Sequence, residues 1–351
     1  MRATSPSPDG DPRQPALALA ALPGVGGVRY RELVARFGSP AAALPHVGDP
    51  ANRAAALKAA CAALDSAGDA GAEVWILGGD RYPSTLDELP DPPPYLFALG
   101  ARATLDAPTV AVVGTRALTA YGARITRELA GALARAGACV ISGLARGVDA
   151  AAHVAALDAG GRTAAVLGTG IDVPYPAAHA ALHARIVERG LVLSEHAPGE
   201  RASPGSFPRR NRLIAALSQV TIVVEAGHRS GALITAAHAL ELGRTVAAVP
   251  GPIDSSQSAG TNELLRDGAV VIATVADALA LLGLGGPRKP ADYEGTPEER
   301  RVWEALAAGP LDLDALTARA ALPVRACLGA VTALELAGVI ECALTGEIRR
   351  R

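Results

Sequence analysis

Short apolar runs alternate with amphipathic stretches through the middle of the chain. Apolar positions at helical spacing fill the intervals between the runs, for example at Ala123–Ala136 and Ala232–Leu242. Continuous apolar strands separated by helices are typical of a mainly parallel sheet covered on both faces. We therefore predict an α/β, Rossmann-like domain over residues 72–282. Its main candidate strands are Val110–Val113, Cys139–Ser142, Thr163–Leu167, Leu191–Ser194, Thr221–Glu225, Val246–Val249 and Val270–Ile272.

The chain before this domain divides into a tail and a helical module. Residues 1–14 are polar and rich in proline, which predicts a disordered tail. Residues 15–66 have helical spacing and contain Leu22-Pro23-Gly24-Val25-Gly26-Gly27, a pattern typical of a small helix-hairpin-helix or SAM-like module. The turn is either a tight connection between packed helices or a place where glycine amides face a phosphate. Residues 72–100 then hold a short strand, Glu73–Leu77, and proline-rich turns.

The pattern after the domain predicts a winged helix. A linker over residues 283–295 is rich in glycine and proline. Helices are expected at Pro297–Ala308, Leu313–Ala320 and Val324–Ala337, followed by a hairpin around Thr345-Gly346, so the winged-helix domain spans residues 296–351. The third helix carries only Arg325 and Glu335 as charged residues. Because a DNA-reading helix is normally more basic, we expect a protein-contact module.

Composition narrows the classes of partner. The net charge is −2, which argues against broad binding to duplex DNA, so any nucleic-acid site must be a local patch. Only 3% of residues are aromatic, so the core must consist mainly of Ala, Val, Leu and Ile. Lysine occurs only at Lys58 and Lys289, and a single arginine is therefore weaker evidence than usual.

Cysteine usage and hydropathy predict a cytoplasmic protein without a cofactor. Cys61, Cys139, Cys327 and Cys342 lie far apart and lack the spacing of zinc ligands. They are typical of small core residues in a reducing compartment. No apolar stretch has the length and composition of a signal peptide or a membrane span.

Glycine-bearing loops follow several of the candidate strands. The carboxyl ends of parallel strands are where doubly wound sheets bind ligands, and glycine lets a ligand approach the backbone closely. Neither a GxGxxG motif nor an acidic residue at the end of the second strand is present, so a nicotinamide cofactor is not expected. The loop residues expected to contact a polyanion are Gly114, Thr115 and Arg116, then Gly143 and Arg146, Gly168 and Gly170, and finally Ser230 and Gly231.

The segment Phe207-Pro208-Arg209-Arg210-Asn211-Arg212 adds cations and an aromatic ring to the same edge. Guanidinium groups suit phosphates, and an aromatic face suits an unstacked base. A solvated helix start would explain the segment alone. Together with the loops, it predicts a groove for a single nucleic-acid strand.

Four polar residues near these loops have other expected roles. Asp149 is expected to cap the helix that follows, and His153 to be a buried structural residue rather than part of a hydrolase site. Glu195 and Glu225 end strands and are expected to orient the arginines by ion pairs, with acid–base chemistry as the alternative.

Taken in order, these motifs resemble those of the DNA-processing protein A family (DprA, also called Smf). The matching segments are Val112–Arg116, Ser142–His153, Phe207–Ile214, Val224–Ala226 with Ser230–Thr235, and Val249–Gly251, within residues 72–275. The resemblance implies a homodimeric protein that binds and protects single-stranded DNA and loads the RecA recombinase during natural transformation. It implies no catalysis. The Gly114-Thr115-Arg116 loop would grip the DNA backbone and Phe207 would stack on a base. Arg212 is expected to be structural for another reason, since it enters a helix that must bury Leu213, Ile214 and Leu217.

The sequence departs from the family pattern at two places, and two other functions stay open. The stretch before Phe207 has no lysine, although Arg201 is a possible substitute, and Thr115 stands where the family frequently has serine. A nucleotide phosphoribohydrolase is one alternative, but Leu167-Gly168-Thr169-Gly170 only partly matches the required phosphate loop. A regulator whose winged helix reads duplex DNA is the other.

Overall fold

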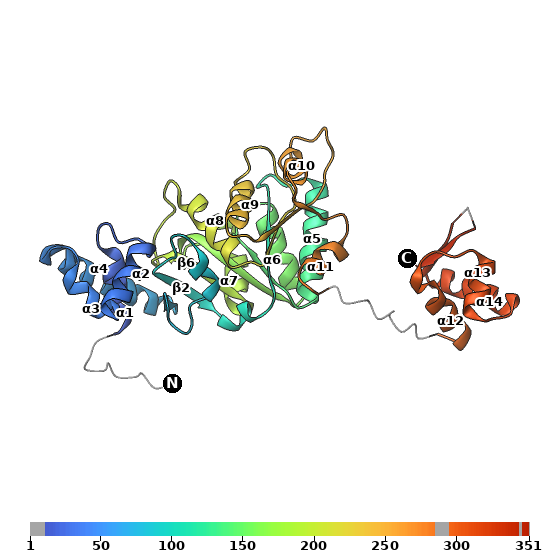
Figure 1. The fold of residues 1–351 in the computed structure, drawn as a ribbon, viewed down its shortest axis with the longest axis horizontal. Coiled ribbons are helices and arrows are strands. Elements are labelled where there is room, and N and C mark those ends of the chain that lie inside the picture. The colour runs from blue at the N-terminus through green and yellow to red at the C-terminus, as the bar shows by residue number, and fades with distance from the viewer. Residues whose placement is uncertain (1–10, 285–294, 344–345, 351) are drawn as a thin grey trace. The chain divides into compact units, whose positions relative to one another are not determined.

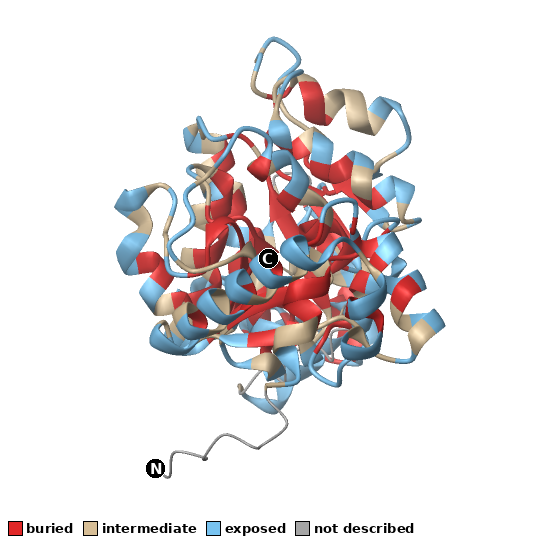
Figure 2. Cartoon of the chain, turned by 90° about the vertical axis from the view of Figure 1, so that its left-hand side faces the viewer, coloured by how far each residue is buried: buried red, intermediate tan, exposed pale blue. Residues whose placement is uncertain are grey.

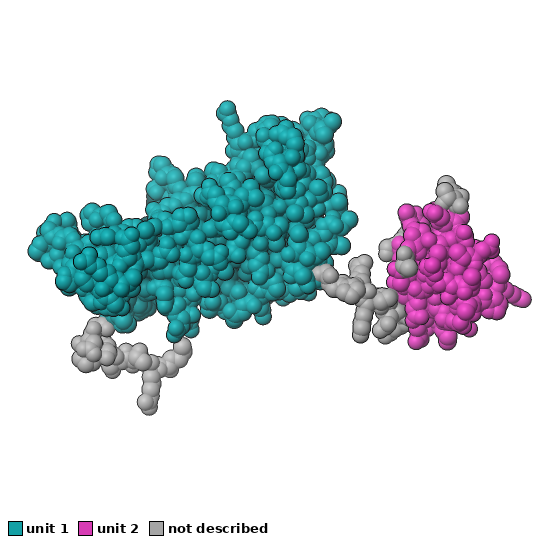
Figure 3. All heavy atoms as spheres, in the orientation of Figure 1, with its two compact units in different colours: residues 1–284 teal, residues 285–351 magenta. Residues whose placement is uncertain are grey.

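The computed structural model describes residues 11–284, 295–343 and 346–350. The chain forms two compact units, Met1–Leu284 and Gly285–Arg351, which Figure 3 distinguishes by colour. Of the tail expected over residues 1–14, residues 1–10 lie outside the described residues, and a helix already begins at Arg13. Most of the expected linker, residues 285–294, is likewise outside them.

The first unit is built on a nine-stranded sheet with the order β1-β2-β6-β5-β4-β3-β7-β8-β9. All neighbours from β6 to β9 pair in parallel, whereas β1 and β2 are antiparallel, so the predicted mainly parallel sheet is confirmed. The strands are β1 (Glu73–Ile76), β2 (Tyr95–Gly100), β3 (Thr109–Val113), β4 (Cys139–Ser142), β5 (Arg162–Gly170), β6 (Leu191–His196), β7 (Val220–Val223), β8 (Thr245–Ala248) and β9 (Val270–Val271).

Helices cover both faces of the sheet, as the fold class requires. In the central strands successive side chains point to opposite faces. Ala111 and Val113 pack with α8 and α9, while Val110 and Val112 pack with α5 and α6. The helices of this unit are α1 (Arg13–Ala21), α2 (Gly27–Phe37), α3 (Pro40–Ala43), α4 (Pro50–Asp69), α5 (Ala120–Arg135), α6 (Val148–Asp158), α7 (Ala180–Arg189), α8 (Ser206–Ala216), α9 (Gly231–Glu241), α10 (Ala259–Arg266) and α11 (Val275–Leu281).

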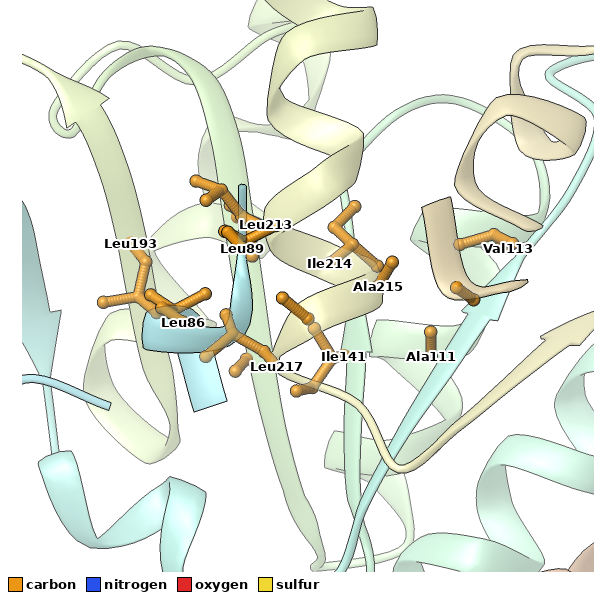
Figure 4. Close-up of a cluster of buried hydrophobic side chains, with 14 of the residues drawn as sticks. Leu86, Leu89, Ala111, Val113, Ile141, Leu193, Leu213, Ile214, Ala215 and Leu217 are labelled. Atoms are coloured by element: carbon orange, nitrogen blue, oxygen red, sulfur yellow. The ribbon is translucent and has the colours of Figure 1, made fainter. Parts of the chain in front are cut away.

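Helix α8 is held to the sheet by one apolar side. Leu213, Ile214 and Leu217 are almost fully buried and lie against strand residues such as Ile141 and against the 3-10 helix Ser84–Glu88 (Figure 4). Buried residues are concentrated along the strands, and the outward sides of the helices are exposed (Figure 2). The position of α8 matters for the site because its first turn reaches the carboxyl edge of the sheet.

The N-terminal helices are part of the same unit as the sheet. Helices α1 to α4 lie at the end of the unit that carries β2 and β6 (Figure 1), and they share one core with β1, β2 and β6. The first amide of α2, on Gly27, donates to Asp91 Oδ1 at 2.7 Å. A Cβ atom at Gly27 would lie 1.8 Å from the Pro92 carbonyl oxygen. Of the two explanations for the glycine turn, the structure therefore supports a tight connection between packed helices. The Gly27 amide already donates to the Asp91 carboxylate and is not left to face a phosphate.

The expected strands lie within a few residues of those observed, but the sequence missed β2. Its segment, Tyr95–Gly100, follows a run of prolines that the pattern assigned to turns. The chain proceeds from β3 to β6 on one side of β3 and continues from β7 to β9 on the other. The order of the strands thus reverses between β3 and β7, and a crevice is expected where their carboxyl ends diverge.

The second unit is a winged helix, as predicted. It comprises α12 (Pro297–Ala305), α13 (Leu313–Ala320), α14 (Val324–Leu336) and a hairpin of β10 (Ile340–Cys342) and β11 (Ile348–Arg350), with its own apolar core. Thr345, expected at the hairpin tip, lies outside the described residues. The outer side of α14 presents Val324, Leu328 and Leu336 to solvent.

Candidate functional site

A cleft of about 510 Å³ lies at the point where the strand order reverses. Its walls are the loop after β3, the first turns of α8 and the loop between β7 and α9. The cleft takes in eight of the residues that the sequence assigned to DNA binding. They are Gly114, Thr115, Arg116, Phe207, Arg210, Asn211, Ser230 and Gly231.

The loop after β3 is fixed by hydrogen bonds and presents one free cation. Thr115 Oγ1 accepts from the Ala117 amide at 3.1 Å and donates to Gln257 Oε1 at 3.2 Å, while the Thr115 amide donates to the Glu225 carbonyl at 2.6 Å. Arg116 is exposed and forms no ion pair within the described residues. Its guanidinium carbon lies 5.3 Å from the centre of the Phe207 ring. The cation and the ring therefore form one contiguous surface at the cleft.

Phe207 sits in the first turn of α8 at the margin of the cleft. A Cβ atom at position 168 would come within 2.9 Å of the Phe207 ring, so glycine is needed at Gly168 to leave room for that ring. The Phe207 ring also contacts a second aromatic ring, that of Tyr175. The two ring centres lie 5.0 Å apart, and the ring planes are inclined by 36°. Tyr175 is 47% exposed. An aromatic surface larger than one ring is thus open to solvent here.

Arg210 is buried, contrary to the expectation that it faces a phosphate freely. Its Nη1 donates to the carbonyl oxygens of Gly143, at 2.7 Å, and of Val166. A Cβ atom at Gly143 would collide with the guanidinium. Burial lowers the pKa of Arg210 to about 10, and the Arg116 charge also lowers it, whereas Asp149 opposes the shift. The side chain remains charged at neutral pH and forms part of the cleft floor.

Arg212 and Arg209 both approach the Glu195 carboxylate, but Arg212 is largely buried and Arg209 is exposed. Arg212 Nη2 donates to Glu195 Oε1 at 2.5 Å, and the Arg212 side chain is only 12% exposed, in line with its structural interpretation. Arg209 lies 4.0 Å from the same oxygen but is 66% exposed. Glu195 therefore pairs with arginines as expected, and Arg209 keeps a largely hydrated cation outside the cleft.

The loop between β7 and α9 closes the other wall. Ser230 caps α9 by accepting from the Ala232 amide at 3.4 Å. Asn211 ties this loop to α8 because its Nδ2 donates to the Gly231 carbonyl at 3.2 Å. Arg229 lines the cleft, is exposed and forms no ion pair in the described part of the chain. The cleft is therefore flanked by free cations on two loops, Arg116 and Arg229.

The remaining predicted residues are placed elsewhere. Gly143, Arg146, Gly168, Gly170, Arg209 and Arg212 do not line the cleft. Gly143 and Gly168 give space to Arg210 and Phe207, as described above. Gly170 packs against the segment around Ala197, where a Cβ atom would lie 2.5 Å from that carbonyl oxygen. Arg146 is exposed on the loop after β4. Most of these glycines thus position neighbouring groups instead of facing a ligand.

Asp149 does not cap a helix, and His153 is structural as expected. Asp149 lies inside the first turn of α6 and accepts from the amides of Gly143 at 3.1 Å and Ala145 at 3.4 Å. Burial raises its pKa. His153 is fully buried, and its Nδ1 donates to Thr163 Oγ1 at 2.7 Å, since the threonine hydroxyl donates to the Val140 carbonyl. Burial, reinforced by Arg210 and His179, lowers the pKa of His153 to about 3.

The acidic residues near the cleft form hydrogen bonds and ion pairs that stabilise the fold. Glu225 is buried and, among the described residues, pairs with no arginine, although the sequence suggested that it would. Its carboxylate accepts from the Thr119 hydroxyl at 2.6 Å and from the Thr119 amide at 3.0 Å, which anchors the start of α5. In the described residues no group of three or more His, Cys, Asp or Glu side chains is placed to hold a metal ion. The described helices also include none with the length and apolar character of a membrane span.

Sequence reasoning missed three residues that shape the site. Tyr175 and Arg229 extend the aromatic and cationic surfaces, and Gln257 supports the Thr115 loop. A signal existed for Tyr175, which follows the Gly168-Thr169-Gly170 end of β5 in a chain with few aromatics. Arg229 immediately precedes the predicted Ser230. Gln257 comes from a distant loop, and its sequence context gives no indication of this contact.

The fold and the site define a Rossmann-like α/β protein with a cationic, aromatic-edged cleft at the strand-order reversal, joined to a winged helix. Residues 73–283 match the family model for DNA recombination-mediator protein A, and residues 286–343 match that for the DprA winged helix domain. The chain therefore belongs to the DNA recombination-mediator protein A family, a family of DNA-processing proteins.

Known proteins similar to the chain agree with this assignment. A protein from Mycobacterium tuberculosis, named as a DNA processing protein DprA, is 47% identical over 260 residues, covering 71% of this chain and 67% of that protein. The X-ray structure of DprA from Streptococcus pneumoniae matches with a TM-score of 0.67 and 35% identity, over 76% of this chain and 95% of that one. A structure of DNA processing protein A from Helicobacter pylori, titled for its single-stranded DNA binding mode, matches with a TM-score of 0.55 and 35% identity, over 60% and 95% of the two chains.

Proposed function

We propose that this protein binds single-stranded DNA through the cleft between β3 and β7 and acts as a mediator of recombination without catalysis. One observation carries the proposal. The exposed Arg116 guanidinium and the Phe207 ring adjoin one another at the margin of a cleft where a doubly wound sheet binds its ligands. The similarity to the Helicobacter pylori protein, whose title names single-stranded DNA binding, supports the same ligand class.

The chemistry of the cleft suits a strand with unpaired bases. Arg116 and Arg229 offer guanidinium groups to phosphates, while Phe207 offers a face to a base. Base–aromatic stacking contributes about 1–3 kcal/mol per base and tolerates any sequence. In duplex DNA the bases are stacked on one another and cannot reach such a ring. With a net charge of −2, the protein has no general attraction for the duplex to compensate for this.

Fluorescence anisotropy with a labelled oligonucleotide tests this function. Single-stranded and duplex forms of one sequence are titrated across a salt series. We expect tight single-strand binding, weak duplex binding and an affinity that falls with salt. If Arg116, Arg229 and Arg209 each neutralise a phosphate, log K falls with log salt with a slope of about −2. Equal affinity for both forms, or no single-strand binding at low salt, would overturn the proposal.

The remaining parts of the proposed function concern partners. As the family resemblance implies, we propose that the protein works in the cytoplasm as a homodimer and helps load RecA on the strand it protects. A dimer would join two clefts and raise the avidity for long strands. Sedimentation measures the oligomeric state, and the rate of RecA filament formation on protein-coated single strands measures loading. A monomer at working concentration would contradict the proposed homodimer. An unchanged rate of RecA filament formation would contradict the proposed role in loading.

A further inference from the structure

Tyr175 presents an aromatic surface outside the cleft, next to Phe207. Its ring centre lies 5.0 Å from that of Phe207, but Tyr175 does not line the cleft itself. The residue is 47% exposed, and its hydroxyl makes no hydrogen bond within the described residues. Neither burial of the ring nor a polar contact of the hydroxyl therefore explains why a tyrosine occupies this place.

The segment around Tyr175 is anchored on both sides. Before it, Thr169 Oγ1 donates to the Val173 carbonyl at 2.6 Å, and His183 Nε2 donates to the Ile171 carbonyl at 2.9 Å. After it, His179 Nδ1 donates to the Leu144 carbonyl at 2.9 Å. The exposed ring is consequently held in place by buried or half-buried contacts. Such a fixed ring loses little freedom when a ligand stacks on it.

We propose that Tyr175 is a second base-stacking subsite, which takes the base adjacent to the one on Phe207 in the same single strand. The inference rests on the proposed function of the cleft. The three groups form a row in which the Arg116 guanidinium adjoins Phe207 and Phe207 adjoins Tyr175. A strand whose phosphate meets Arg116 in the cleft thus leaves it over Phe207 and reaches Tyr175 next. The ligand is a run of at least two unpaired nucleotides of any sequence.

Matched variants separate stacking from packing. Tyr175→Leu keeps an apolar side chain beside Phe207 but removes the aromatic face, whereas Tyr175→Phe and Tyr175→Trp retain the face. We expect Tyr175→Leu to raise the Kd for a labelled single strand about tenfold or more. The phenylalanine and tryptophan variants are expected to stay within about twofold of the unaltered protein. Leu240→Ala, at a residue of α9 that is 59% exposed, serves as the surface control.

An oligonucleotide made only of abasic sites provides the second readout. It keeps the phosphates and removes every base, so Tyr175→Leu and the unaltered protein are expected to bind it equally. Photocrosslinking from single 5-iodouracil positions, mapped by mass spectrometry, is expected to join neighbouring nucleotides to Phe207 and Tyr175. If Tyr175→Leu binds the normal strand unchanged, or if it weakens the abasic strand as much as the normal one, the stacking subsite is overturned while the cleft stands. If the unaltered protein binds no single strand, both proposals fall.

Discussion

Arg209, Arg210 and Arg212 lie within four residues of each other, yet their side chains end in three environments. Arg209 is largely hydrated, Arg210 is buried against two carbonyl oxygens, and Arg212 pairs with Glu195 at the edge of the core. Of the three, only Arg209 is largely exposed, while Arg210 meets the cleft as part of its floor. In this protein the depth of an arginine along one helix, rather than its presence in a basic run, determines what it can do.

At Arg116, truncation is predicted to weaken DNA binding without affecting the fold. Arg116→Ala removes an exposed cation that has no ion-pair partner in the described residues, so stability should change by no more than about 0.5 kcal/mol. The Kd for a single strand at low salt is expected to rise about tenfold, with a smaller salt slope. Anisotropy titrations measure both. Arg127→Ala is the control, because Arg127 is also exposed and has no ion pair with any residue that the structure describes. Equal Kd values for the two variants would exclude Arg116 from the site.

At Arg210, substitution is predicted to destabilise the protein. Arg210→Met keeps much of the volume, but it leaves the Gly143 and Val166 carbonyls without their donor and removes the cation next to Asp149. Loss of one member of such a buried charged network costs about 3–5 kcal/mol. Arg209→Ala is the neighbouring control and should stay within about 0.5 kcal/mol. Urea unfolding compares them, and similar free energies of unfolding for both variants would contradict the assignment of Arg210 to the core.

Because His153 is buried in its neutral form, its contribution to the stability of the fold decreases as the pH falls. Burial lowers its folded pKa to about 3 from the ordinary value of 6.5, so the unfolded chain binds the additional proton between these values. This contribution to stability is complete above about pH 6.5 and is lost as the pH falls towards 3, by up to about 1.4 kcal/mol per pH unit. Asp149, whose pKa burial raises, contributes with the opposite sign.

The histidine is isolated by comparison with His153→Asn, which retains a hydrogen-bond donor for Thr163 but cannot titrate. The unaltered protein is expected to lose more stability than the variant in urea unfolding between pH 7 and pH 5. Parallel stability curves for the two proteins would mean that His153 takes up its proton equally in the folded and unfolded states, so that burial does not lower its pKa.

Among the secondary-structure elements, the parallel strands and the position of the site followed from the sequence. The central strands are continuous apolar runs, which few other structures explain, and glycine loops after them identify the carboxyl edge. The antiparallel strand β2 was missed because the prolines before Tyr95 indicate turns and a run of six residues has no clear periodicity. One of its two pairing partners, β6, is remote in sequence.

The depth of the α8 arginines could be predicted in part. Arg210 precedes the buried Leu213, Ile214 and Leu217 by three, four and seven residues, which places it on the same side of the helix. This spacing indicates burial for Arg210, whereas Arg212, one, two and five residues before the same three, is not placed on that side by it. That carbonyl oxygens of β5 and of the loop after β4 would meet its guanidinium depends on tertiary packing, which no local pattern contains.

Gly168, near the end of β5, yields a prediction at the level of these elements. Gly168→Ala would place a methyl group 2.9 Å from the Phe207 ring and force the start of α8 or the ring to shift. Single-strand affinity is expected to fall several-fold. Gly68→Ala, on α4 where a Cβ atom meets nothing within 4 Å, should leave affinity unchanged and is the control. Near-UV circular dichroism and anisotropy follow the ring environment and the affinity. Unaltered affinity in Gly168→Ala would show that the ring position is not critical.

On the scale of the whole molecule, the two modules that flank the sheet domain differ in whether they have a core of their own. The helices α1 to α4 share a core with the sheet, although residues 15–66 and 72–282 were expected as separate domains. The winged helix has a core of its own. Cutting the chain before residue 72 would therefore expose apolar surface of the sheet.

Removal of residues 285–351 is predicted to leave DNA binding unchanged. The cleft belongs entirely to the first unit, and α14 carries only Arg325 and Glu335 as charged residues. The shortened protein should bind single strands within about twofold of the full chain. The isolated winged helix should not bind duplex DNA in the same anisotropy assay. A large loss of single-strand affinity on shortening would indicate that the second unit contributes directly to the strand's path.

The bracing of the cleft walls determines which partner must become ordered on binding. Because Gly143 closes on Arg210 and Gly168 on Phe207, these two side chains have little conformational freedom left to lose. The free-energy cost of ordering is therefore borne mainly by the nucleic acid. It depends on how much free energy is needed to separate the stacked bases of the strand. Runs of pyrimidines, which stack weakly, should settle into the cleft more easily than runs of adenine. The protein would then distinguish strands by their stiffness, without reading the edge of a single base.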